Sequence, residues 1–412
     1  MSRDLPRRLR SLVWDRGLAA LVLCALFLMI SSVSPAPGEG PHPSAATTVL
    51  ASPQAFPEVP SLTCHAALLM EWQTGTILYE KNGFVRMHPA SITKIMTALL
   101  ALENGRLEDL VTVSEEAASQ IGSSMYLRAG DVYTLEDLLY GLMLNSGNDA
   151  AWAIAEHIGG TADAFSDMMN RRAREIGAIN TQFRNPHGLT DPNHYTTAFD
   201  IALIARTCLR HPYFRRLVST REKEVIDASG QVESILANTN RLLWIYSGAD
   251  GVKTGTTEAA GQCLVASATR GDMKLLSVVL ASEDRWADSA ALLDYGFNNF
   301  RLLRLANAGD TLLELPCRGA IQDTVPVVAK TDLLCLVPRN ALGLDLRFEL
   351  PEGVSPCRGG TVIGRALVFL GKDIVGRADL MTGEWVMPKT PASLIGRAGA
   401  WITQNAVRMG LF

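Results

Sequence analysis

Apolar positions along this chain follow two periods, that of a strand and that of a helix. The stretch CHAALLMEWQTGTILYEKN, from about 64 to 83, has two apolar runs around Thr74 and Gly75 and predicts a β-hairpin. PASITKIMTALL, at 89–100, predicts a buried helix, because its apolar residues recur every three or four positions: Ile92, Ile95, Met96, Leu99 and Leu100. Pro89 suits the first turn, and Gly105 is expected to end the helix in the left-handed conformation.

Further helices and strands follow the same patterns. TLEDLLYGLMLNS and DAAWAIAEHIG predict helices, and CLVASATRGDMKLLSVVLAS predicts two strands joined at Gly271 and Asp272. DSAALLDYGFNNF predicts a helix after them. Strands at both ends of this region with helices between them indicate an α/β domain, one sheet flanked by helices, over 61–304.

After about 305 the pattern changes to short runs of β-forming residues separated by Pro, Gly and Asp. TVIGRALVFLGKDIVGRADLMTG predicts a hairpin that turns near Gly371. The sequence therefore predicts a small all-β domain over 305–388. It contains no set of residues that indicates catalysis, so a role as spacer or docking module is expected.

The two ends of the chain have patterns of their own. Five arginines precede an apolar run from Leu18 to Ile30, which is typical of a secretory signal peptide over 1–36, with a retained signal anchor as the alternative. Residues 37–60 are rich in Pro, Ser, Ala and Gly and indicate a linker.

Residues 389–412 predict an amphipathic helix. Its apolar residues gather on one side of a helical wheel: Leu394, Ile395, Ala398, Trp401, Ile402, Met409 and Phe412. No acidic residue occurs from Ala392 onward. A basic amphipathic helix with a Trp in its apolar stripe is typical of a helix that lies in a membrane interface. Packing of the same face against the protein itself is the alternative.

Composition and cysteine spacing argue against nucleic-acid binding and against a metal site. The 412 residues are 48% hydrophobic and carry a net charge of -4, with no basic patch of the kind that binds nucleic acid. None of the seven cysteines forms a C-x-x-C pair, so neither a zinc site nor any other metal or cofactor is predicted. Buried free thiols are expected, although an exported protein can also form disulfides.

Lys94 interrupts the apolar helix that begins near Pro89. One interpretation is a lysine whose stem covers apolar surface while its ammonium group reaches water. The other is a catalytic pair, because residues three apart share a helix face and Ser91 precedes Lys94 by three. A buried lysine near a helix N-terminus is pushed toward its neutral form, which can take the proton of a serine hydroxyl.

Two further motifs favour the catalytic pair. SGN, with Ser146 and Asn148, lies between two predicted helices, and KTG, comprising Lys253, Thr254 and Gly255, precedes the predicted strand pair. Each alone has an ordinary structural explanation, as an interhelix turn or a strand end. S-x-x-K, S-D-N and K-T-G in this order are the signature of penicillin-binding proteins and class A β-lactamases, and here Gly147 takes the middle position of the second motif.

With these motifs, the chain resembles the low-molecular-mass penicillin-binding proteins that are D-alanyl-D-alanine carboxypeptidases. The resemblance extends over about 64 to 412 and includes PASITKIMTA, LMLNSGNDAA, FRNPHGL, GVKTGTT and RWADSAALLDYGF. It implies a transpeptidase-like domain followed by a small β domain. It also implies a peptidoglycan stem peptide as substrate, β-lactams as covalent inhibitors, and a place on the outer face of the cytoplasmic membrane.

The resemblance assigns a role to each matching residue. It implies that Ser91 attacks the bond between two D-alanines, that Lys94 is the general base and that Ser146 relays a proton to the leaving amine. Asn148 would hold the acyl side chain, and Lys253, Thr254 and Arg285 would bind the terminal carboxylate. The oxyanion hole would combine the N–H of Ser91 with that of Thr256 or Thr257, and Gly255 would let the substrate backbone approach. For Arg285, a surface arginine that caps a helix is the alternative.

Three alternatives to a carboxypeptidase remain. A class A β-lactamase would carry an E-x-x-L-N loop, and no such string occurs between Asn148 and Lys253. A DD-endopeptidase fits the same motifs. A non-catalytic wall-binding protein would keep the pocket but lack a working nucleophile, whereas all motif residues are present here.

Overall fold

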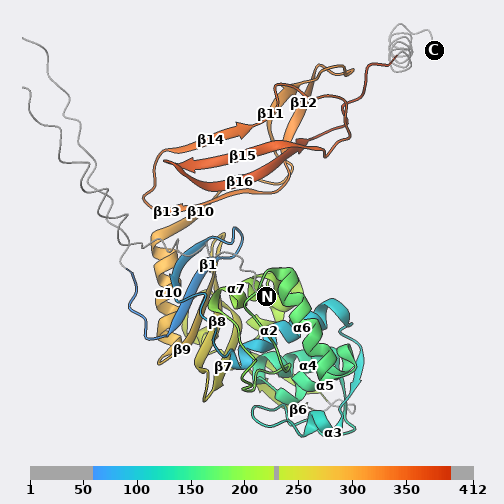
Figure 1. The fold of residues 1–412 in the computed structure, drawn as a ribbon, viewed down its shortest axis with the longest axis vertical. Coiled ribbons are helices and arrows are strands. Elements are labelled where there is room, and N and C mark those ends of the chain that lie inside the picture. The colour runs from blue at the N-terminus through green and yellow to red at the C-terminus, as the bar shows by residue number, and fades with distance from the viewer. Residues whose placement is uncertain (1–58, 227–231, 391–412) are drawn as a thin grey trace, which may run out of the picture. The chain divides into compact units, whose positions relative to one another are not determined.

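The computed structural model describes residues 59–226 and 232–390, which lie within one compact unit that begins at Pro57 (Figure 1). The predicted signal peptide, nearly all of the linker and nearly all of the C-terminal helix fall outside the described residues. Among the residues that are described, no helix combines the length and the apolar composition that crossing a membrane requires.

A five-stranded antiparallel sheet forms the centre of the first domain, in the order β2-β1-β9-β8-β7. Its strands are β1 (Ala66–Glu71), β2 (Ile77–Lys81), β7 (Ala249–Thr257), β8 (Gly261–Arg270) and β9 (Met273–Ser282). The predicted hairpins at 64–83 and at Gly271 are confirmed. Strand β1 pairs with β9, so the two ends of the domain meet in the middle of the sheet.

The sheet separates two hydrophobic cores, and alternate residues of β1 enter one or the other. Leu68 and Met70 belong to the larger core, whereas Ala67 and Leu69 belong to the smaller one. This is the period-2 alternation of a strand that is buried on both faces. Helix α10 (Arg285–Asn299) contributes Leu292 and Phe297 to the smaller core. The predicted α/β architecture, with a sheet between layers of helices, is thereby confirmed.

The other helices belong mainly to the larger core. The longer ones are α2 (Lys94–Asn104), α5 (Asn148–Gly159), α6 (Ala162–Ile176), α7 (Ala198–Cys208) and α8 (Pro212–Ser219). The shorter ones are the 3₁₀ turn η1 (Ala90–Thr93), the π turn η2 (Gly141–Asn145), α3 (Glu115–Ala118), α4 (Leu135–Tyr140) and α9 (Leu242–Ile245). Two hairpins complete this part: β3 (Leu110–Thr112) with β4 (Val132–Thr134), and β5 (Glu222–Ile226) with β6 (Val232–Ala237).

The second domain is a seven-stranded antiparallel sheet, as the β-rich pattern predicted. Its strands are β10 (Phe300–Ala306), β11 (Thr311–Pro316), β12 (Thr324–Ala329), β13 (Leu333–Pro338), β14 (Leu344–Glu349), β15 (Val362–Leu370) and β16 (Asp373–Thr382). The β15–β16 hairpin turns at Gly371, whose φ of 63° is left-handed. Strand β10 follows α10 without a linker and therefore begins at Phe300, ahead of the boundary predicted at 305.

Two local predictions about the helix near Ser91 were wrong. Ser91 lies in η1, and the α-helix begins only at Lys94. Gly105 is extended, with φ -114° and ψ 170°, rather than left-handed. Its lack of a side chain matters for packing instead, because a Cβ there would lie 2.5 Å from Leu135 Cδ2. Tertiary packing, not turn conformation, explains this glycine.

Candidate active site

Ser91 and Lys94 meet at the junction of η1 and α2. Lys94 Nζ lies 3.0 Å from Ser91 Oγ, which is hydrogen-bond distance. A 3₁₀ turn has three residues per turn, so side chains at i and i+3 eclipse each other. The 3₁₀ conformation of Ala90–Thr93 therefore aligns this pair more directly than the expected α-helix would.

The Lys94 amino group has two more partners, both from distant segments. Asn148 Oδ1 lies at 2.7 Å and the carbonyl oxygen of His187 at 3.0 Å. Asn148 Nδ2 donates to the carbonyl of Ile121, which orients the amide so that its oxygen faces Lys94. A neutral amine would donate its two N–H groups to these two acceptors, and its lone pair would then face the Ser91 hydroxyl.

Lys94 is 0% exposed, so its amino group does not reach water as a snorkelling lysine would. Burial holds the pKa of Lys94 well below its usual value, and the nearby positive charge of Lys253 lowers this pKa further, against an opposing effect of Asp149. A neutral amine beside a serine hydroxyl can accept its proton and make the oxygen a nucleophile.

The second motif begins with a residue in an unusual conformation. Ser146 ends η2 with φ 63° and ψ 32°, a left-handed conformation that is rare outside glycine, and its side chain is buried. Such strained residues persist only where surrounding contacts hold them. The next residues supply such contacts. Asn148 N–H donates to the carbonyl of Ser123. The Asp149 carboxylate accepts from Ser124 Oγ and from three backbone N–H groups, those of Met125, Leu127 and Ala150.

The third motif lies on β7, which is the last strand at one edge of the sheet. Gly255 brings this edge against η1, because a Cβ there would lie 3.0 Å from Ser91 N, Ile92 N and Pro89 O. The expectation was that Gly255 makes room for a substrate backbone. The structure adds a second reason for the glycine, which is close contact between β7 and η1, and the role toward substrate stays a prediction.

Lys253 is buried and lacks a hydrogen-bond partner. It is 1% exposed, and no acceptor contacts its Nζ anywhere in the described parts of the chain. Burial, and to a smaller extent Arg285, lowers the pKa of Lys253 to about 7. The hydroxyl of the neighbouring Thr254 is held 2.8 Å from Thr239 Oγ1. A buried amino group without a partner is a suitable site for an anion.

Arg285 lies at the KTG strand, where the resemblance expects it. Its Nη1 donates to the carbonyl of Gly255 at 2.9 Å and to Thr256 Oγ1 at 2.8 Å. The N-cap of α10 is formed by Asp284 instead, whose side chain accepts from the N–H groups of Trp286 and Ala287. Arg285 is therefore not the helix-capping surface residue of the alternative interpretation.

Sequence reasoning did not find the support behind Ser91. His194 is buried, accepts from the N–H of Arg184 on Nδ1 at 3.2 Å, and therefore has its proton on Nε2, 2.9 Å from Thr93 Oγ1. Burial lowers the pKa of His194 to about 4 and that of His187 to about 3, so both imidazoles are neutral at pH 7. Thr93 directly precedes Lys94, so His194 helps to fix the turn that carries the Ser–Lys pair.

Comparisons with known proteins identify the family of this chain. A family model described as D-alanyl-D-alanine carboxypeptidase matches residues 53–284. The D-alanyl-D-alanine carboxypeptidase DacF of Bacillus subtilis (strain 168) is 36% identical over 330 residues, which cover 77% of this chain and 85% of the relative. DacA of Haemophilus influenzae is 35% identical, over 86% of this chain and 91% of its own length.

Solved structures show the same fold. A crystal structure of penicillin binding protein 5 from Haemophilus influenzae is similar with a TM-score of 0.72 and 33% identity, over 80% of this chain and 99% of that one. The carboxypeptidase DacD from Francisella tularensis has a TM-score of 0.64 and 30% identity, over 84% of this chain and 99% of that one. The likeness therefore extends over both domains.

Proposed function

The chain belongs to the D-alanyl-D-alanine carboxypeptidase family, and from this premise we propose that it removes the terminal D-alanine from peptidoglycan stem peptides. The observation that carries the proposal is the buried Lys94 amino group, 3.0 Å from the Ser91 hydroxyl. A serine with a neutral amine as its base is suited to acyl transfer without a metal or cofactor.

In the proposed reaction, Lys94 takes the Ser91 proton as Ser91 Oγ bonds to the carbonyl carbon between the two D-alanines. The N–H groups of Ser91 and Thr256 stabilise the oxyanion that develops, because preorganised donors favour that charge. The C–N bond then breaks, Ser146 relays a proton to the amine, and D-alanine leaves. Water hydrolyses the ester on Ser91 and restores the enzyme.

Substrate recognition uses the third motif. The substrate ends in a carboxylate, and Lys253, Thr254 and Arg285 provide two cations and a hydroxyl around the KTG strand. Strand β7 is an edge strand, so its outward-facing N–H and C=O groups can pair with an extended peptide. Asn148 is assigned to the acyl side chain, and its 2.7 Å contact suggests that it also orients Lys94.

The proposal includes where the enzyme acts. A signal peptide over 1–36 and a linker over 37–60 would export a DD-peptidase domain, residues 61–304, and a β-rich domain, residues 305–388. The helix over 389–412 would lie on the outer face of the cytoplasmic membrane, because its polar side is basic. Sedimentation with anionic vesicles tests this, and a full chain that stays in the supernatant would contradict it.

Release of D-alanine is the measurement that tests the function. The purified chain is incubated with a wall pentapeptide precursor, and free D-alanine is quantified against a Ser91→Ala variant. We expect release by the unsubstituted chain and none by the variant. Rapid turnover of penicillin without D-alanine release would identify a β-lactamase, and cleavage of cross-linked peptides alone would identify an endopeptidase. A fluorescent penicillin that leaves no covalent label would indicate a non-catalytic binder.

A further inference from the structure

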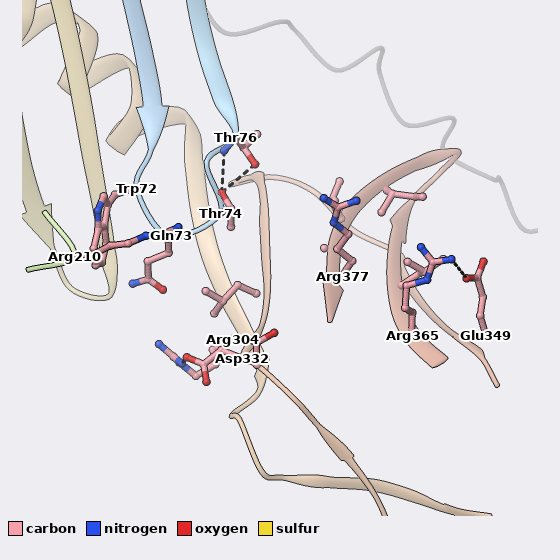
Figure 2. Close-up of a pocket in the computed structure, with 16 residues that line it drawn as sticks. Trp72, Gln73, Thr74, Thr76, Arg210, Arg304, Asp332, Glu349, Arg365 and Arg377 are labelled. Atoms are coloured by element: carbon pink, nitrogen blue, oxygen red, sulfur yellow. Dashed lines mark hydrogen bonds and ion pairs between the residues drawn. The ribbon is translucent and has the colours of Figure 1, made fainter. Parts of the chain in front are cut away.

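A cavity of about 1030 Å³ lies away from the motif residues, and we call it the junction pocket. One wall is the β1–β2 turn at Trp72–Thr76 together with Arg210, and the other comes from strands of the β domain (Figure 2). None of the residues predicted for the active site lines it. The volume is in the range of pockets that enclose drug-sized molecules.

The lining of the junction pocket is positively charged. It has four arginines and two carboxylates, on a chain whose net charge is -4. Arg304 pairs with Asp332, and Arg365 pairs with Glu349 at 3.3 Å. Within the described part of the chain, the guanidinium groups of Arg210 and Arg377 make neither an ion pair nor a hydrogen bond. Two positive charges, one from each domain, thus remain without a partner.

The turn that forms one wall is held firmly. The buried Glu71 carboxylate accepts from the N–H groups of Gln73 and Thr74 at 3.0 and 2.7 Å. Arg206 donates to the carbonyls of Trp72 and Gln73, both at 2.7 Å. This wall is therefore preorganised, and a ligand would not have to order it on binding.

The β domain is attached to the first domain by direct contacts outside the pocket lining. Arg339, after β13, donates through Nε to the carbonyl of Phe297 and through its backbone N–H to that of Asn299, both at 2.8 Å. Leu336 of β13 packs in the same core as Leu292 and Phe297 of α10. The β domain is thus attached to α10 by buried contacts as well as by the chain.

The remaining lining combines apolar and hydroxyl groups. Leu334, Leu367, Ile374 and Val375 contribute aliphatic surface, and Ile374 is 56% exposed. Thr74, Thr76 and Thr331 contribute hydroxyls. A matching ligand therefore has carboxylates for the arginines, which bind them with two parallel hydrogen bonds, and small apolar groups for the aliphatic surface.

We propose that the junction pocket binds a carboxylate-bearing wall peptide, a second contact with the polymer that is separate from the site of cleavage. This rests on the proposed function, because an enzyme of peptidoglycan meets peptides with several free carboxylates and alanine methyl groups. Such a peptide uses both the arginines and the aliphatic surface. A phosphodiester polymer offers no apolar groups for Ile374 and Leu367, and the surface of a membrane cannot enter a pocket.

Calorimetric titration of the full chain tests the proposal. All titrations use the Ser91→Ala protein, and the probe is a muramyl tetrapeptide, which lacks the terminal D-alanine. Replacing Arg210 and Arg377 together by Gln is expected to weaken binding about tenfold, since two charge-assisted contacts are lost. The control is the double variant Arg174→Gln, Arg358→Gln, which removes one exposed arginine from each domain outside the pocket and should change the affinity less than about twofold.

A probe with amidated carboxylates should bind the parent about as weakly as the intact probe binds the pocket variant. Equal affinity of the parent and the pocket variant for the intact probe would overturn the proposal. The proposal would also be overturned if the pocket variant bound the tetrapeptide as the parent does and lost affinity only for a glycerol phosphate polymer or for anionic vesicles. D-alanine release by the unsubstituted chain is measured in parallel. Its absence would count against the proposed function alone, since the Ser91→Ala titrations do not depend on turnover.

Discussion

Lys94 Nζ lies 3.0 Å from Ser91 Oγ, and the amino group is enclosed by Asn148 and the carbonyl of His187. With its two N–H groups donated to these acceptors, a neutral Lys94 amine would direct its lone pair toward the Ser91 hydroxyl. Its low pKa has its main cause in burial, so the enclosure that orients the amine also favours its neutral form.

Replacing Lys94 by Arg should abolish most of the acylation by penicillin. Arg keeps much of the length, but its guanidinium stays protonated and cannot act as a base. We expect the acylation rate to fall at least ~100-fold, in the range that loss of a general base costs. Stopped-flow measurement with a fluorescent penicillin gives the rate.

The matched control is Lys81→Arg, which changes a lysine whose Nζ donates to the carbonyl of Leu62. That variant should acylate at the parent rate. Circular dichroism and Tm show whether Lys94→Arg is folded. A folded Lys94→Arg protein that acylates normally would remove the general-base role.

Lys253 should gain a proton when a substrate carboxylate binds. Its pKa of about 7 in the empty site is low because of burial, and a carboxylate nearby favours the charged form and raises this pKa. In Ser91→Ala protein at pH 8, peptide binding should therefore take up protons, seen as a dependence of the binding enthalpy on the buffer. Lys253→Met should show no such uptake.

The same residue can be tested through specificity. Lys253→Met should weaken acylation by peptides with a free C-terminal carboxylate, and amidation of that carboxylate should then cost little more. A variant that still prefers the free carboxylate as strongly as the parent would give Lys253 another role.

His194 should make stability depend on pH in the acid range. Its folded pKa of about 4 lies below the usual 6.5, so the unfolded chain binds the proton first as pH falls. Its contribution to the free energy of unfolding is therefore complete above pH 6.5 and is lost between 6.5 and 4, by up to about 3 kcal/mol. Urea unfolding of the parent and of His194→Gln measures the difference.

The variant should lose part of this acid dependence, whereas the control His65→Gln, at an exposed histidine, should keep it. Identical acid dependence in the parent and in His194→Gln would show that the buried imidazole is not the cause.

Gly255→Ala should slow acylation, because the new Cβ would meet the backbone of Ser91 and Pro89 at 3.0 Å and push β7 away from η1. We expect the acylation rate to fall about tenfold or more, in line with the sensitivity of catalysis to small misplacements. Gly353→Ala is the control, since its Cβ would meet the carbonyl of Pro316, also at 3.0 Å, in the β domain. If Gly353→Ala lowered the acylation rate as much as Gly255→Ala does, the effect could not be assigned to the contact between β7 and η1.

The sequence could predict contacts between residues close in the chain. Ser91 and Lys94 are three apart, so any helical turn brings them together, and the hairpins at Gly75 and Gly271 join adjacent runs. The order of the S-x-x-K, SGN and KTG motifs along the chain then indicated the fold. These features depend on local periodicity and on recognisable motifs, both of which the printed sequence carries.

Contacts between distant residues could not be predicted in the same way. The carbonyl of His187 reaches Lys94 across 93 positions, and Thr239 reaches Thr254 from a loop with no motif. Gly105 looked like a helix stop and proved to be a packing position beside Leu135. Each of these depends on how elements pack, which hydrophobic periodicity does not encode.

The most direct test of the central claim is to locate the acyl group. The chain is incubated with penicillin, digested, and the adduct is mapped by tandem mass spectrometry, alongside Ser91→Ala. We predict one adduct, on the peptide that contains Ser91, with none in the variant. An adduct on Ser146 or elsewhere in the parent, or an undiminished adduct in Ser91→Ala, would contradict the account of Ser91 as the nucleophile.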